Sequence, residues 1–204
     1  MADIQKLAVI GAGQMGHGIA QVAAVAGLDV VMADISQDAL DDGVAAVEKS
    51  LGKFVEKERL DADARDAALA RLSTTTSTEE AASGADLIVE AVTENEELKL
   101  DIFRTLDEAA PEHAILASNT SSISITRIAA ATSRPDKVIG MHFMNPVPIM
   151  KLVEIIKGLA TSDETYEKVD AVAEKMGKTT VLAEDYPGFI VNRVLMPMIN
   201  EAAF

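Results

Sequence analysis

His142 and Glu154 are the two residues whose types and positions could best support proton transfer. His142 follows the apolar run 138–141, and a side chain at the end of such a strand reaches the edge where open α/β sheets bind ligands. Glu154 interrupts the apolar run 151–156, where a carboxylate is costly unless it is paired. A carboxylate that orients an imidazole and stabilises its charged form makes the histidine a general acid or base. A satisfied core histidine and an edge-strand glutamate would explain the same residues without catalysis.

A glycine-rich loop near the start of the chain could hold a dinucleotide. It has the G-x-G-x-x-G spacing, in Gly11-Ala12-Gly13-Gln14-Met15-Gly16. The first glycine allows a tight turn, the second lets the backbone approach a pyrophosphate, and the third permits close packing of a helix on a strand. The loop lies between a strand pattern at 6–10 and a helical pattern at 15–26, whose first N–H groups would face the phosphates. This order of strand, loop and helix makes a chance glycine-rich turn a poor explanation.

Asp34 follows the second expected strand, 29–33, and could discriminate between the nicotinamide cofactors. A carboxylate at this place accepts hydrogen bonds from the ribose hydroxyls of NAD and repels the 2′-phosphate of NADP. The next residue is Ile35, where a protein that binds NADP often has arginine. The sequence therefore predicts NAD as the cofactor.

Short apolar runs alternate with longer amphipathic segments along most of the chain. Strands are expected at 6–10, 29–33, 86–92, 114–118, 138–142, 151–156 and 179–182. The alternation predicts an α/β fold, a doubly wound Rossmann-type sheet with helices on both faces. Two consecutive helical patterns at about 38–72 exceed what one crossover needs and indicate an inserted helical hairpin. We expect an NAD-binding domain over residues 1–186.

The last segment, 187–204, has a different pattern. Its apolar stripe at helical spacing consists of Ile190, Val191, Val194, Leu195, Met198, Ile199, Ala202 and Ala203. The sequence stops within this stripe without a capping signal, so we expect the first helix of an all-α C-terminal domain that is truncated. Such a helix should fold back, pair with another copy or become disordered, which would displace Asn192 from the His142 pocket.

The composition excludes several classes of function. A net charge of −15 argues against nucleic acid or an anionic membrane surface as a partner. The absence of cysteine rules out disulfides, cysteine-ligated zinc and thiol nucleophiles, and no metal site is expected. Residues 1–5 are followed at once by a strand pattern, and no apolar run approaches the ~18 residues of a membrane span. A cytoplasmic enzyme is therefore expected.

Three motifs, in this order along the chain, resemble those of the 3-hydroxyacyl-CoA dehydrogenase family. They are Ser118-Asn119-Thr120-Ser121-Ser122, Gly140-Met141-His142-Phe143-Met144-Asn145-Pro146-Val147-Pro148-Ile149-Met150-Lys151-Leu152-Val153-Glu154, and Pro187-Gly188-Phe189-Ile190-Val191-Asn192-Arg193. The resemblance extends over essentially the full chain and is greatest to the short, single-function bacterial members. It implies an oxidoreductase that transfers a hydride between NAD and the C3 hydroxyl of a short-chain 3-hydroxyacyl-CoA, such as 3-hydroxybutyryl-CoA.

The resemblance also implies roles for individual residues. His142 would be the general base that removes the 3-hydroxyl proton, and Glu154 would pair with it. Ser121 would hydrogen-bond the reacting oxygen, and Asn192 would contact the substrate near the thioester. The residues expected at the cofactor are Gly11, Gly13, Gln14, Met15, Gly16, Asp34, Glu94, Lys99, Asn119, Ser121 and Asn145.

Coenzyme A is expected to bind on the helical hairpin. Ser50, Lys53 and Lys57 lie three and four residues apart and share one helix face, and the resemblance implies that coenzyme A contacts this hairpin. Cations would suit its phosphates, although lysines on a helix are commonly just solvated. The family's second domain usually forms the dimer interface, so a homodimer is expected for a full-length form.

Two other classes of function fit part of the sequence. Dehydrogenases of small 3-hydroxy acids also bind NAD, but they rely on a helix-borne lysine rather than a strand-borne histidine and glutamate. A non-catalytic NAD-binding protein is the second alternative. Retention of the four expected catalytic residues speaks against it for the parent protein, whereas the 204-residue form could bind NAD without efficient turnover.

Overall fold

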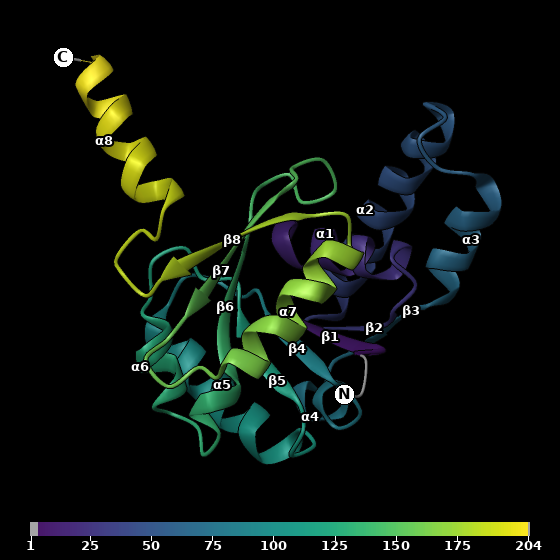
Figure 1. The fold of residues 1–204 in the computed structure, drawn as a ribbon. Helices are drawn as coiled ribbons and strands as arrows, with labels where there is room; N and C mark the ends of the chain where they lie inside the picture. Colours follow the sequence, from purple (N-terminus) through teal and green to yellow (C-terminus); the bar gives the residue numbers. More distant parts are fainter. Residues whose placement is uncertain (1–3, 204) are drawn as a thin grey trace.

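An eight-stranded sheet lies at the centre of the molecule (Figure 1). The structure is a computed structural model, and it describes residues 4–203. The strand order is β3-β2-β1-β4-β5-β6-β7-β8. The strands are β1 (Lys6–Ile10), β2 (Asp29–Ala33), β3 (Leu72–Thr75), β4 (Leu87–Glu90), β5 (Ile115–Ser118), β6 (Val138–Phe143), β7 (Leu152–Lys157) and β8 (Thr179–Glu184). The alternating pattern of the sequence thus predicts the α/β Rossmann-type fold correctly.

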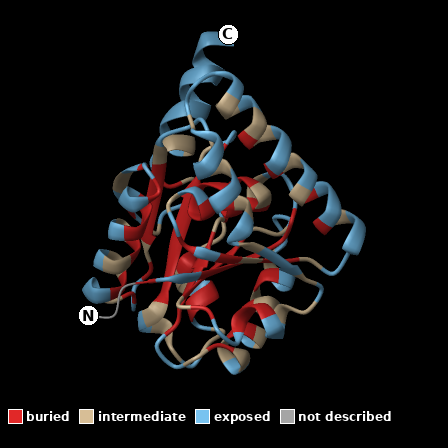
Figure 2. Cartoon of the chain, turned by 90° about the vertical axis from the view of Figure 1, so that its right-hand side faces the viewer, coloured by how far each residue is buried: buried red, intermediate tan, exposed pale blue. Residues whose placement is uncertain are grey.

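Helices cover both faces of the sheet. They are α1 (Gln14–Val25), α2 (Gln37–Glu56), α3 (Ala62–Ala70), α4 (Thr78–Ala82), α5 (Glu96–Ala109), α6 (Ile125–Ala129), α7 (Asp163–Lys175) and α8 (Val191–Ala203), with a 3-10 turn at Pro135–Lys137. One apolar core lies between the sheet and α1, α2, α3 and α7, and a second lies under α4, α5 and α6. Figure 2 shows buried strands enclosed by helices whose outer turns are exposed. Within residues 4–203, no helix combines the length and the apolar character that crossing a bilayer requires.

The chain leaves the centre of the sheet in two directions. β1 pairs in parallel with β2 on one side and with β4 on the other. The connections that follow β1 and β4 therefore diverge and leave a crevice at the carboxyl ends of these strands, where α/β proteins bind ligands. The glycine-rich loop follows β1 at this edge.

The strands at the other end of the sheet change direction. β6 and β7 are antiparallel, and β8 runs parallel to β7. In this register His142 lies opposite Glu154. Opposite residues of an antiparallel pair extend from the same face of the sheet, so the register brings the imidazole and the carboxylate together.

The expected helical hairpin consists of α2 and α3, which extend beyond the sheet (Figure 1). Ser36 caps α2 by accepting a hydrogen bond from the Ala39 N–H. The strand that follows, β3, was not predicted. Its sequence is Leu-Ser-Thr-Thr, and it pairs with β2 at the edge of the sheet. A polar, half-exposed edge strand lacks the apolar run by which buried strands are recognised.

α8 projects away from the rest of the protein (Figure 1). It buries none of its residues, and Val194 and Met198 of its apolar stripe are 62% and 58% exposed. Of the three outcomes expected for this helix, folding back onto the domain and disorder are therefore wrong, and pairing with another copy stays a prediction. The start of α8 is fixed because Glu154 Oε1 accepts hydrogen bonds from the Ile190 and Val191 N–H groups, both at 2.8 Å.

Candidate active site

The loop between β1 and α1 requires glycine at two positions. Gly11 has a φ of +106°, and a Cβ there would lie 2.8 Å from the Ala91 carbonyl oxygen. A Cβ on Gly16 would lie 1.7 Å from the Gly11 carbonyl oxygen, so α1 can approach the loop only without a side chain. Gly13 faces open space, with no atom within 4 Å of its Cβ position. The loop therefore combines a tight turn with a free backbone surface that a phosphate can approach.

Asp34 lies beside this loop, directly after β2. Its Oδ2 accepts a hydrogen bond from the Ala12 N–H at 2.9 Å, and its Oδ1 accepts one from the Ser36 N–H at 3.1 Å. A carboxylate has about four lone-pair positions, so acceptor capacity remains for ribose hydroxyls.

A cavity of about 510 Å³ adjoins the loop and Asp34. It is lined by Ile10, Gly11, Gly13, Gln14, Met15, Asp34, Ile35, Thr78, Ala91, Val92, Thr93, Leu98 and Ile102. Aliphatic walls suit a flat base, and the carboxylate suits the ribose attached to it. These residues therefore fit the adenosine half of a dinucleotide.

His142 connects two of the other expected catalytic residues. Its Nδ1 lies 2.7 Å from Glu154 Oε2, and its Nε2 lies 3.1 Å from Ser121 Oγ. Glu154 is fully buried, and His142 is only 6% exposed. The Phe189 ring packs edge-on against the imidazole at 5.8 Å between centroids. The three polar groups therefore form a line from the interior of the sheet to its open edge.

Hydrogen bonding determines how this line is protonated. Burial raises the pKa of Glu154, but hydrogen bonds from His142 and from the Val191 and Ile190 N–H groups outweigh it and hold the pKa below its ordinary value. Glu154 is thus an ionised carboxylate that can only accept hydrogen bonds. His142 must therefore donate from Nδ1, which leaves the Nε2 lone pair of a neutral imidazole free to take a proton.

Asn192 belongs to the same cluster. Asn192 lies in the first turn of α8, and its Nδ2 is 3.4 Å from the Ser121 carbonyl oxygen. The expected displacement of Asn192 is wrong, because the contacts of Glu154 with the start of α8 keep this turn against the sheet.

Lys99 lies in a buried ion pair with Glu90. Its Nζ is 2.6 Å from Glu90 Oε1, and the two side chains are 1% and 0% exposed. Ser118 Oγ donates to the second oxygen of Glu90 at 2.7 Å. Glu90 was not predicted, although it ends the apolar strand β4 and so carries the same signal as Glu154.

Glu94 joins this ion pair to the Ser121 segment. Its Oε2 lies 3.6 Å from Lys99 Nζ. Its Oε1 accepts hydrogen bonds from the Thr120 hydroxyl at 2.5 Å and from the Ser121 and Ser122 N–H groups at 3.0 and 3.2 Å. Glu94 is 41% exposed and can face a ligand, whereas Lys99 is enclosed behind it.

Asn119 and Asn145 occupy different parts of this edge. Asn119 Oδ1 accepts a hydrogen bond from the Phe143 N–H at 2.9 Å and so ties the end of β5 to the end of β6. Asn145 is exposed and lines a second cavity.

The second cavity, of about 410 Å³, collects the residues expected at coenzyme A. It is lined by Gln14, His17, Gln21, Ala46, Lys49, Ser50, Lys53, Phe54, Lys57, Arg59, Asn145, Pro146, Val147, Pro148 and Ile149. Lys49 and Arg59 were not predicted, because nothing in the helical period shows that they turn toward the segment after β6. The lining contains four cationic side chains and no acidic one, which suits a phosphorylated ligand.

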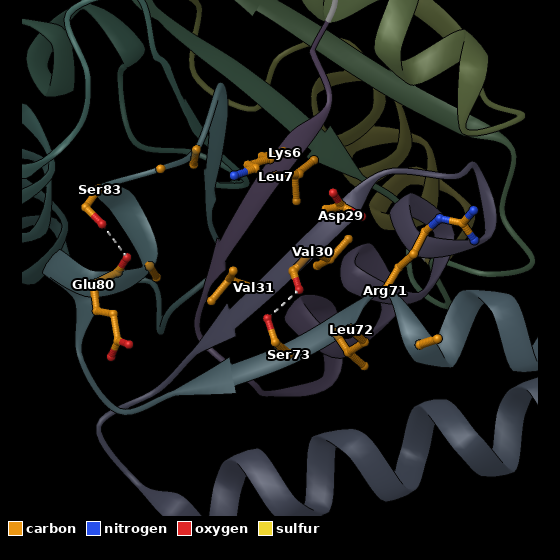
Figure 3. A pocket seen from close by; sticks show the side chains of 14 residues that line it. Lys6, Leu7, Asp29, Val30, Val31, Arg71, Leu72, Ser73, Glu80 and Ser83 are labelled. Carbon is orange, nitrogen blue, oxygen red and sulfur yellow. Dashed lines mark hydrogen bonds between the residues drawn. The ribbon is translucent and has the colours of Figure 1, made fainter.

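A further hollow of about 360 Å³ lies at the opposite edge of the sheet (Figure 3). Lys6 and Asp29 are the first residues of their strands, and Arg71 and Glu80 complete a lining of mixed charge. It is thus separated from the carboxyl edge by the length of the strands. Among the described residues, no group of three or more histidine and acidic side chains is arranged to hold a metal ion.

Comparison with known proteins identifies the family to which this chain belongs. The profile described as "3-hydroxyacyl-CoA dehydrogenase, NAD binding domain" matches residues 6–186. The probable 3-hydroxybutyryl-CoA dehydrogenase of Bacillus subtilis is 53% identical over 99% of this chain and 70% of its own length. The 3-hydroxybutyryl-CoA dehydrogenase of Bradyrhizobium diazoefficiens is 50% identical over 100% of this chain and 69% of its own. The crystal structure of (S)-3-hydroxybutyryl-CoA dehydrogenase from Ralstonia eutropha superposes with a TM-score of 0.95, at 50% identity over 98% of this chain and 70% of that one. The chain therefore belongs to the 3-hydroxyacyl-CoA dehydrogenase family of NAD-dependent oxidoreductases.

Proposed function

We propose that this protein oxidises the C3 hydroxyl of a short-chain 3-hydroxyacyl-CoA, such as 3-hydroxybutyryl-CoA, with NAD, and catalyses the reverse reduction. The observation that carries this proposal is the line of hydrogen bonds from Glu154 through His142 to Ser121. The names of the relatives from Bacillus and Bradyrhizobium support a short acyl chain.

The proton transfer follows from the protonation of this line. The chemistry that bound NAD would supply is a hydride acceptor for C3 of the substrate. His142 Nε2 takes the proton of the 3-hydroxyl group, while Ser121 Oγ hydrogen-bonds the same oxygen and orients it. Glu154 stabilises the resulting imidazolium, because its ionised carboxylate already holds Nδ1–H. In the reverse direction the imidazolium returns the proton to the forming hydroxyl.

The cofactor would lie along the carboxyl edge of the sheet from Asp34 toward Asn119 and Ser121. Gly11, Gly13 and Gly16 shape the loop that meets its pyrophosphate, and Gln14 and Met15 line the cavity beside it. We assign the ribose of the adenosine to Asp34, which favours NAD over NADP. Glu94 would face the cofactor directly, and Lys99 would act on it only through Glu94.

The cationic cavity would bind coenzyme A. Ser50, Lys53 and Lys57 line it together on α2, and Asn145 stands at its other wall. This arrangement would let the thioester lie near His142 while the phosphates contact the helical hairpin.

Residues 187–204 would form a separate helical unit beside an NAD-binding domain of residues 1–186. The support is that α8 buries none of its residues, although its first turn brings Asn192 to Ser121. Asn192 would contact the substrate near the thioester and so contribute to turnover, not to cofactor binding. Inefficient turnover by residues 1–204 no longer follows from a displaced Asn192, so it stays a prediction. A homodimer of a full-length form and a cytoplasmic location stay predictions.

The test is NADH oxidation with acetoacetyl-CoA, run beside acetoacetate and beside calorimetric titration of NADH. We expect NADH binding, and consumption of NADH with the thioester only. Equal rates with acetoacetate would favour a dehydrogenase of small hydroxy acids. Binding of NADH and of the thioester without turnover would favour the non-catalytic alternative for these residues.

A further inference from the structure

The proposed coenzyme A cavity continues into a neighbouring one of about 350 Å³. The two cavities share Gln21, Phe54, Pro148 and Ile149. Both follow α1, the first from Gln14 to Gln21 and the second from Gln21 to Ala26. At about 1.5 Å per residue, the groove follows roughly 18 Å of helix from the carboxyl edge of the sheet. We call the second cavity the groove extension.

The groove extension is cationic in an acidic protein. Its charged lining residues are Lys151, Lys175 and Lys178, and no acidic residue lines it. The whole chain carries a net charge of −15, so a hollow whose only charged lining residues are lysines departs from the average surface. Its walls also include the exposed apolar side chains of Ile149 and Met150, which suit an anion attached to an organic group.

Lys178 places an uncompensated charge at the base of the groove extension. Its Nζ donates hydrogen bonds to the Val147 and Met150 carbonyl oxygens at 2.5 and 2.9 Å. Burial lowers the pKa of this amine, and no carboxylate offsets the effect. A buried cation that is held only by carbonyl dipoles favours an anion nearby.

Gln21 marks the junction of the two cavities. It is 1% exposed, and its Oε1 has no hydrogen-bond partner among the described residues. A buried amide oxygen without a partner is costly, and a ligand donor can satisfy it. The junction can thus accept a hydrogen bond from a polar group of a ligand that extends through both cavities.

We propose that the groove extension binds the 3′-phosphate of coenzyme A through Lys151 and Lys175. This inference rests on the proposed function. Coenzyme A carries a diphosphate and, across its ribose, a separate 3′-phosphate, and the groove offers two separate groups of cations. The diphosphate would lie at Lys53 and Lys57, and Gln21 Oε1 would accept a hydrogen bond from the segment between the phosphates. Lys178 would keep the wall formed by Val147 and Met150 in place through its two hydrogen bonds, and its positive charge would add to the attraction for the 3′-phosphate.

The test compares acetoacetyl-CoA with its 3′-dephospho analogue by calorimetry in the presence of NADH. We expect the unmodified protein to bind the phosphorylated ligand about 10-fold more tightly, as two partly exposed charged pairs would allow. Lys175→Ala should weaken only the phosphorylated ligand, by about 5-fold, and the double variant with Lys151→Ala should abolish the preference. Lys168→Ala is the matched control, because it removes a lysine of the same helix that pairs with Glu164.

Four outcomes decide between the assignments. A preference that falls to about 2-fold in Lys175→Ala, disappears in the double variant with Lys151→Ala and persists in Lys168→Ala supports the proposal. A preference that disappears in Lys57→Ala instead, or equal affinity for the two ligands in the unmodified protein, overturns the assignment and leaves the proposed function intact. Failure to bind either ligand while NADH binds would count against both, because the groove would then not be a coenzyme A site.

Discussion

Two buried ion pairs lie near the carboxyl edge of the sheet. They differ in whether the basic partner keeps a nitrogen atom that is available to other groups at that edge. Glu154 pairs with His142 at 2.7 Å, and Glu90 pairs with Lys99 at 2.6 Å. Both carboxylates have no exposed surface. Lys99 is directed inward, with its other contacts at the Val92 carbonyl oxygen and Glu94. His142 instead presents its second nitrogen to Ser121.

The difference shows why a buried charge does not by itself identify a catalytic group. An ammonium has three donors and no acceptor, so Lys99 beside a carboxylate has no lone pair with which to take a proton. An imidazole that donates from one nitrogen keeps a lone pair on the other with which to take a proton. We therefore expect changes in the Glu90 pair to act mainly on stability, and changes in the Glu154 pair to act mainly on turnover.

The largest expected effect is on stability, from Lys99→Met. This change leaves the Glu90 carboxylate buried without its cation and should lower the free energy of unfolding by about 3–5 kcal/mol. Urea unfolding measures it, with Arg104→Ala as the control, because Arg104 pairs with Asp101 at the surface. The double variant Glu90→Leu/Lys99→Met should recover much of the loss, because it removes both charges. A loss as small as that of Arg104→Ala would remove the contrast between the two pairs.

The next effect is on turnover, from His142→Ala. In a catalytically competent form, kcat should fall at least ~100-fold, the lower range for loss of a general base. Glu154→Ala should have a similar effect, and the double variant should lose little more, because the pair acts as a unit. NADH affinity, measured by calorimetry, should change little in all three. His113→Ala is the control, since His113 is an exposed histidine beside Asp86. Near-normal kcat in either single variant would refute the assignment.

A smaller effect should appear in the pH dependence of stability. The pKa of Glu154 is held below its ordinary value in the folded protein, so the unfolded chain binds its proton first as the pH falls. The stabilisation is therefore complete above the ordinary glutamate pKa of about 4.3 and is lost as the pH falls through the folded pKa. Unfolding curves of the unmodified protein and Glu154→Gln should converge as the pH is lowered through this window. A constant difference in unfolding free energy would contradict this linkage.

Local pattern predicts the parts of the site that depend on sequence neighbours. The glycine loop, Asp34 and the two strands that carry His142 and Glu154 follow from residue spacing and from apolar runs. The pairing of Glu90 with Lys99 does not, because it joins a strand to the buried face of α5, and no period shows which lysine turns inward. The direction of α8 likewise cannot be predicted from local pattern, since it depends on hydrogen bonds from backbone N–H groups to the distant Glu154.

Asp34 offers the smallest effect and extends the comparison to a carboxylate that has no cationic partner among residues 4–203. Its oxygens are held only by the Ala12 and Ser36 N–H groups, so its negative charge is free to discriminate between cofactors. Asp34→Asn keeps an acceptor oxygen but removes the charge, and Asp34→Ala removes both. We expect Asp34→Ala to weaken NADH binding about 10-fold, the scale of one lost hydrogen bond to a charged group. Asp34→Asn should weaken NADH less and still narrow the gap between NADH and NADPH, because repulsion of the 2′-phosphate depends on charge alone. Calorimetry with both cofactors separates the two contributions, and tighter binding of NADPH by the unmodified protein would refute the role of Asp34.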